Sequence, residues 1–462
     1  MAIVGAVIVP HPPIILPEVG GGREREISKT SGTYYAAMKR LASWEPDAVV
    51  ILSPHTILYA DYFHISPGEG ASGDMASFGV PRLKLEVRYD TVLRERIISQ
   101  VERAGLPAGT MGEREASLDH GTFILLYFME KAGLSCPIIR CGLSGLSPLE
   151  HYELGRCIKA AAEADGKRIA IVASGDLSHK LKEDGPYGLA PEGPEFDVQV
   201  TEAMGKGDFL SFLTFDADFC QRAAECGLKA FQVMAGALDG LAVSPELLSY
   251  EGTFGVGYGV AVFEVAGKDE GRCFADRYEA LEQERLRETK EQEDPWVQLA
   301  RLSLETYVGS GKRLKELPSD LPEELRQQAA GVFVSLHEHG QLRGCIGTTE
   351  PVTASVADEI VRNAVFAGAE DPRFPAVTAS ELGSLEYKVD VLGAPEAIDG
   401  PEQLDVRRYG VIVSCGHRRG LLLPDLDGID TVQQQIDIAR QKGGIGAEEA
   451  YSLERFEVVR HR

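Results

Sequence analysis

Residues 2–13 read AIVGAVIVPHPP: an apolar, β-branched run that stops at prolines on either side of His11. Three later runs have the same form, with a polar or glycine-rich exit: DAVVILSP (47–54), PIIRCGLS (137–144) and RIAIVASGDLSH (168–179). Helix-like stretches lie between several of them. Uninterrupted apolar strands alternating with helices predict an α/β domain with a largely parallel or mixed central sheet flanked by helices. Ligands of such domains lie at the carboxyl ends of the strands.

The chain divides into three parts by composition. Residues 1–267 carry the α/β pattern, and HGTFILLYFMEKAG (120–133) predicts a buried helix. Residues 268–294 are charge-dense and favour a solvated helical connector. Residues 295–462 predict an α+β domain, with helices over 295–309 and near 429–441 and strands near 331–337, 385–393 and 410–415.

Composition limits the classes of function. With 462 residues and a formal net charge of -24, the chain is expected to bind neither nucleic acid nor an acidic membrane surface, because such a field repels phosphate. The eight cysteines contain no C-x-x-C pair, which favours reduced thiols. Prolines interrupt the first apolar run, so we expect no signal peptide and a cytoplasmic protein.

Histidines gather at predicted element ends. His11, His55 and His179 follow strands, and His120 begins the buried helix. One such residue would be an ordinary loop imidazole, but four in one α/β domain indicate a shared site. His64 and His151 receive no role.

Two neutral imidazoles and one carboxylate would form a facial triad for Fe(II). Glu251, before the glycine-rich stretch GTFGVGYG (252–259), is one candidate carboxylate. Asp176 and Asp119 compete with it, although their expected role is to orient His179 and His120 through the ring N–H groups.

The motifs VPHPP, LSPH, LDHGT, GDLSH and EGTFGVGY, in this order over residues 2–265, resemble the class III (LigB-like) extradiol dioxygenases and the related Memo proteins. The resemblance implies that His11, His55 and Glu251 hold Fe(II), with another divalent metal as the alternative. It makes His179 the acid/base residue and His120 a donor near bound oxygen or substrate. The implied function is O2-dependent oxidation of a small catechol-like or aromatic molecule.

Memo-like members of this superfamily replace part of the triad with histidine and cysteine. Cys226, in AAECGLKAF (223–231), matches their cysteine–glycine position, although a buried structural cysteine is the simpler interpretation. The alternative function is therefore a Memo-like metal-binding partner or scaffold that cleaves no ring.

The second domain contains QLRGCIGTTEP (341–351). Arg343 could lower the pKa of the Cys345 thiol and make it nucleophilic, or the segment could be a tight turn around a packed cysteine. With NAVFAGAEDPRFPAVTASEL (363–382), LEYKVDVLGAPEAI (385–398) and GVIVSCGHRRGLLLPDL (410–426), this stretch resembles the AMMECR1 family over residues 290–462. We expect a site of Arg343, Cys345, Arg373 and His417. The fusion implies a radical SAM protein as partner, and a homodimer is a family-level expectation.

Overall fold

The computed structural model describes residues 2–112, 114, 117–426, 428–429 and 431–462. The chain forms two compact units, Met1–Leu281 and Glu282–Arg462. Helix α10 (Ala275–Gln292) crosses this division, within the predicted connector 268–294. Within the described residues, no helix is both long enough and apolar enough to cross a bilayer.

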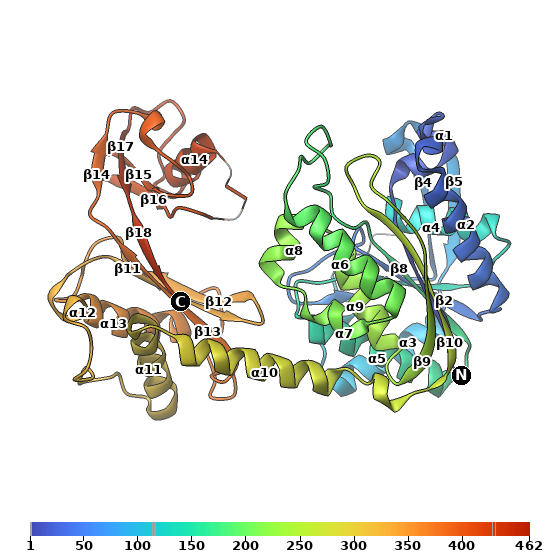
Figure 1. The fold of residues 1–462 in the computed structure, drawn as a ribbon, viewed down its shortest axis with the longest axis horizontal. Helices are drawn as coiled ribbons and strands as arrows, with labels where there is room; N and C mark the ends of the chain where they lie inside the picture. The colour runs from blue at the N-terminus through green and yellow to red at the C-terminus, as the bar shows by residue number, and fades with distance from the viewer. Residues whose placement is uncertain (1, 113, 115–116, 427, 430) are drawn as a thin grey trace. The chain divides into compact units, whose positions relative to one another are not determined.

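A six-stranded sheet forms the centre of the first unit (Figure 1). Its strands in spatial order are β7 (Ile138–Gly142), β2 (Ala48–Ser53), β8 (Ile169–Ser174), β1 (Ile3–Val9), β10 (Tyr258–Lys268) and β9 (Leu241–Glu251). The first four are parallel, while β10 pairs antiparallel with both β1 and β9. The predicted α/β fold with a mixed central sheet is confirmed.

The central strands are apolar throughout because both faces of the sheet are covered. Along β1, Val7 and Val9 belong to one core, while Ala6 and Ile8 belong to the other. The first core includes helices α2 (Ser28–Ser43) and α4 (His120–Lys131). The second includes helices α3 (Thr91–Ala104), α5 (Pro148–Asp165) and α9 (Leu228–Ala237). As predicted, α4 is buried, from Gly121 to Met129 without a break.

Smaller elements surround this sheet. A hairpin of β4 (Gly70–Met75) and β5 (Val80–Arg88) carries a 3-10 turn, Ala76–Phe78, at its tip. Beyond β8 lie α6 (Glu192–Lys206), α7 (Phe209–Thr214) and α8 (Ala217–Ala223). The short elements are α1 (Pro17–Gly20), β3 (Phe63–His64) and β6 (Ala108–Gly109).

The second unit contains two four-stranded antiparallel sheets. One has the order β12 (Gln341–Gly347), β11 (Val332–Glu338), β13 (Leu385–Leu392), β18 (Val458–His461). The other has the order β14 (Glu396–Ile398), β17 (Ser452–Phe456), β15 (Gly410–Cys415), β16 (Arg418–Leu422). The helices are α11 (Pro295–Ser310), α12 (Glu323–Gln327), α13 (Val356–Ala369) and α14 (Val432–Lys442). The predicted α+β class is confirmed; residue 430, inside the expected helix near 429–441, lies outside the described residues.

Helix α11 and the last strand of this second unit, β18, touch. Asp294 caps α11 by accepting hydrogen bonds from the backbone N–H groups of Trp296 (3.0 Å) and Val297 (3.1 Å). The other carboxylate oxygen of Asp294 lies 2.5 Å from Nδ1 of His461, in β18. The His461 ring also stacks on Trp296, with ring centroids 4.3 Å apart.

Candidate metal centre

Three neighbouring parallel strands deliver histidines to one edge of the first sheet. His11 follows β1, His55 follows β2 and His179 follows β8, the strand between them. His120 is the first residue of α4. The ligand nitrogens of His11, His55 and His120 all lie within 4.8 Å of one another, and among the described residues this is the one such group.

The imidazole rings of this cluster are in close contact. Nε2 of His55 lies 2.9 Å from Nε2 of His11. Ring centroids are 4.5 Å apart for His11 and His55, and 4.1 Å apart for His55 and His120. Gly121 permits this approach, since a Cβ at that position would lie 2.9 Å from Oγ of Ser53 and 3.4 Å from Cδ2 of His55.

Hydrogen bonds to buried groups fix the orientation of His11. Its Nδ1 lies 2.9 Å from Oγ of Ser174, the last residue of β8. Its backbone N–H donates to the Asp176 carboxylate at 2.8 Å. With Nδ1 engaged, Nε2 faces the other histidines, which is how protein metal sites orient a ligating imidazole.

Asp119 connects the segments that carry His55 and His120. Its carboxylate caps α4 by accepting from the backbone N–H of Thr122 at 2.8 Å. It also accepts from Oγ of Ser53 at 3.0 Å and forms a buried ion pair with Arg140 at 3.1 Å. These bonds hold the end of β2 beside the start of α4.

Burial keeps these histidines neutral. Burial, and then the charges of His55, His120 and His179, lower the pKa of His11 well below its usual range. Burial lowers the pKa of His120 to about 4, and it lowers the pKa of His55 and His179 as well. Neutral imidazoles at pH 7 keep their lone pairs available, so this donor set fits a divalent metal ion.

Cys226 lies beside the cluster. Its Sγ is 3.6 Å from Nε2 of His11 and donates to the Asp176 carbonyl oxygen at 3.6 Å. Two glycines allow the segment of Cys226 to lie close to the end of β8, because a Cβ on Gly175 would lie 2.0 Å from Cα of Gly227. Burial raises the pKa of the Cys226 thiol well above its usual range, so a metal would have to displace its proton.

The predicted carboxylate ligand, Glu251, is engaged elsewhere. Glu251 is the last residue of β9. Its carboxylate accepts hydrogen bonds from the backbone N–H of Thr30 (2.6 Å) and from the Thr30 hydroxyl (2.5 Å). Within the described residues it belongs to no metal-ligating group with the histidines, and His120 completes the set of three instead. Asp176 was expected to orient the His179 ring. Its carboxylate accepts a hydrogen bond from the His11 backbone N–H instead.

The remaining first-unit histidines differ from one another. Nε2 of His179 is buried and has no hydrogen-bond partner among the described residues. Nδ1 of His64 lies 3.1 Å from the Met111 carbonyl oxygen, and Nδ1 of His151 lies 2.9 Å from that of Ser147. His64 and His151 therefore each contact a backbone carbonyl oxygen.

The predicted site of the second unit is held by ion pairs. Arg343 binds Glu381 at 2.7 Å, and Arg373 binds Asp371 at 2.7 Å and the Cys345 carbonyl oxygen at 3.0 Å. His417 is exposed in the turn between β15 and β16, on the other sheet.

Burial opposes activation of the cysteine by the arginines. Burial raises the pKa of Cys345, and the nearby Arg373 charge opposes this only in part. Cys345 lies inside strand β12, paired with Ser335 of β11, so the expectation of a tight turn around it is wrong. The buried thiol disfavours the nucleophilic interpretation.

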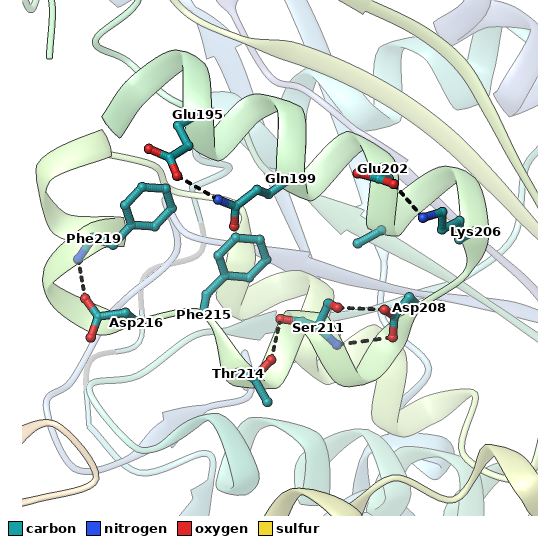
Figure 2. Close-up of a pocket in the computed structure, with 11 residues that line it drawn as sticks. Glu195, Gln199, Glu202, Lys206, Asp208, Ser211, Thr214, Phe215, Asp216 and Phe219 are labelled. Atoms are coloured by element: carbon teal, nitrogen blue, oxygen red, sulfur yellow. Dashed lines mark hydrogen bonds and ion pairs between the residues drawn. The ribbon is translucent and has the colours of Figure 1, made fainter. Parts of the chain in front are cut away.

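A separate cavity of about 530 Å³ lies between α6, α7 and α8 (Figure 2). Its carboxylates are engaged locally: Asp208 and Asp216 cap α7 and α8, and Glu202 pairs with Lys206. None of the histidines lines it. We assign it no function.

Comparison with known proteins identifies the first unit. A family model described as the catalytic LigB subunit of aromatic ring-opening dioxygenase matches residues 5–261, more than half of the chain. The chain belongs to the LigB family. The AMMECR1 family model matches residues 297–461. The chain is thus a LigB domain followed by an AMMECR1 domain, as the motifs predict.

One relative matches the whole chain, and others match only part of it. Protein CA_C1420 of Clostridium acetobutylicum is 38% identical, with all of both chains covered. A Thermotoga maritima protein is 45% identical over 37% of this chain and 98% of its own. The crystal structure of the uncharacterized protein PH0010 from Pyrococcus horikoshii has 32% identity over 36% of this chain and 88% of that chain, with a TM-score of 0.33. The LigB domain with its histidine cluster makes this chain a metalloenzyme-like or Memo-like protein.

Sequence reasoning underestimated one ligand candidate in the LigB domain. His120 was expected near oxygen or substrate, yet its ring lies in the cluster with His11 and His55. The signal was present in the sequence: a histidine directly after a capping Asp119 and before a glycine starts a buried helix.

Proposed function

We propose that the LigB domain is a non-haem metal-dependent oxidoreductase that uses O2 to oxidise a small catechol-like or aromatic substrate. His11, His55 and His120 would hold the metal, with Fe(II) as the first candidate. The observation that supports this proposal is the meeting of three neutral imidazoles at the carboxyl edge of the sheet. A bound metal of this kind supplies a template for substrate and O2 and stabilises negative charge on the substrate oxygens.

The protein's own residues supply the proton transfer. His179 has a buried Nε2 without a partner among the described residues, so it can accept a proton from a substrate hydroxyl and return it. Its lowered pKa keeps the ring neutral at pH 7, the form that accepts a proton.

Anaerobic metal analysis of the full chain, expressed in iron-replete cells, tests this assignment. We expect near-stoichiometric iron in the wild type, and loss of iron in His11→Ala and His120→Ala. Glu251→Gln serves as the matched control, because its carboxylate binds Thr30. Retained iron in His120→Ala together with lost iron in Glu251→Gln would contradict the three-histidine set and favour the two-histidine, one-carboxylate set.

A second candidate function is a Memo-like metal-binding protein that cleaves no ring. The observation in its favour is the 3.6 Å distance from Cys226 Sγ to His11 Nε2. Loss of metal in Cys226→Ala, with no O2 uptake on any catechol, would favour this candidate. Metal retention in Cys226→Ala, with O2 uptake by the iron-loaded wild type, would favour the oxidoreductase.

A further inference from the structure

Two exposed aromatic rings flank the histidine cluster. The ring of Phe78 meets the ring of His120 edge-on, with centroids 5.6 Å apart. The ring of Tyr187 lies tilted against His179, with centroids 5.1 Å apart. Phe78 is 38% exposed and Tyr187 is 59% exposed, so a large aromatic surface remains open to solvent beside the site.

Backbone hydrogen bonds anchor the two segments that carry these rings. Phe78 ends the 3-10 turn of the β4–β5 hairpin, and Ser72 of β4 accepts a hydrogen bond at 3.0 Å from Leu118, two residues before His120. Tyr187 lies in the segment between β8 and α6, which is attached by a 3.1 Å hydrogen bond from the Leu181 N–H to the Gly255 carbonyl oxygen.

The histidines themselves add ring surface beside Phe78 and Tyr187. His55 is exposed, and its ring lies 4.1 Å from that of His120. The two carboxylates that adjoin the histidines bind protein groups: Asp119 caps α4 and pairs with Arg140, and Asp176 binds the His11 backbone. Aromatic and imidazole rings attract the faces and edges of other aromatic rings.

We propose that Phe78 and Tyr187 are substrate-positioning residues that bind a planar aromatic ring beside the histidine cluster. The identity of that ring as the substrate rests on the proposed function. The recognition itself depends on the ring faces, so it operates in the metal-free protein as well. It selects aromatic over saturated diols.

Fluorescence titration of the metal-free full-length protein with 2,3-dihydroxynaphthalene tests the proposal. We expect binding by the wild type, and binding about three- to tenfold weaker in each of Phe78→Ala and Tyr187→Ala. Tyr187→Phe should bind as the wild type does, because the ring is kept. Tyr35→Ala is the matched control, an aromatic residue 40% exposed on α2. A saturated competitor, 1,2-cyclohexanediol, should not displace the probe.

Either of two results would overturn the proposal: no binding to the metal-free wild type, or equal affinity in wild type, Phe78→Ala and Tyr187→Ala. The proposed function fails separately, by loss of metal binding or O2 uptake. Probe binding that depends on both rings, in a protein that takes up no O2, would keep this inference and discard the oxidoreductase.

Discussion

At the residue scale, the buried hydroxyl of Ser174 orients one histidine of the cluster. Its Oγ lies 2.9 Å from Nδ1 of His11 and so fixes which ring nitrogen faces the cluster. We expect Ser174→Ala to weaken metal binding about tenfold, the usual effect of removing a group that orients a ligating imidazole. Competition with a chelating dye measures the affinity. Ser249→Ala is the control, because Ser249 is also a buried serine, on β9, and binds Thr33 instead of a histidine. Equal affinity in Ser174→Ala and wild type would mean that the ring needs no such anchor.

Asp197 gives the LigB domain a pH-dependent stability. Its buried carboxylate accepts hydrogen bonds from the Ser178 N–H (2.8 Å) and the Tyr250 hydroxyl (2.7 Å), yet burial raises its pKa from 3.8 to about 6. The folded state therefore binds more protons than the unfolded state between these pH values. The free energy of unfolding should fall as pH rises from 4 to 6, by up to ~3 kcal/mol.

Asp197→Asn removes this titration. The variant should be less stable than the wild type at pH 4 and should gain on it as pH rises to 7. Urea denaturation of both proteins at several pH values measures the difference. A stability difference that is the same at pH 4 and pH 7 would contradict the raised pKa.

At the scale of elements, the Asp119 cap of α4 joins this helix to the end of β2. Asp119 serves the helix, the end of β2 and the guanidinium of Arg140, which is 3% exposed. Asp119→Ala leaves that buried charge unpaired, so we expect a loss of about 3–5 kcal/mol in the free energy of unfolding. Asp208→Ala removes an exposed cap from α7 and should cost only ~1 kcal/mol. Similar losses in the two variants would show that Arg140 finds another partner.

Elements buried on both sides could be predicted from the sequence, and half-exposed ones could not. The four parallel strands and α4 are apolar at nearly every position, so their type and extent follow from composition. β5 alternates exposed and half-buried residues, and it acquires its structure by pairing with β4. The sequence pattern does not predict the long strand β9 for a similar reason, since most of its residues are only partly buried.

The same contrast holds for the site. Histidines at the ends of parallel strands must converge, which made His11, His55 and His179 predictable. The choice between Glu251 and His120 depends on contacts between distant segments: Thr30 of α2 binds the carboxylate, and Asp119 brings α4 to β2. No local pattern encodes such contacts.

At the scale of the whole molecule, the two units have separate hydrophobic cores. We expect the pieces 1–281 and 282–462 to fold independently. Calorimetry of the full chain should show two transitions. Each piece should reproduce one of them within about 4 °C, the shift that ~1 kcal/mol gives in a unit of this size. A single transition, or an unfolded piece, would contradict this expectation.

The contact of α11 with β18 brings the two ends of the AMMECR1 domain together. Because Asp294 and Trp296 bind His461, the AMMECR1 domain enters and leaves its fold at one place. A domain of this kind can be appended to a neighbour, or inserted into a surface loop of an unrelated host, with little strain on either. Such a domain can therefore be transferred between proteins as one unit, by recombination or by protein engineering.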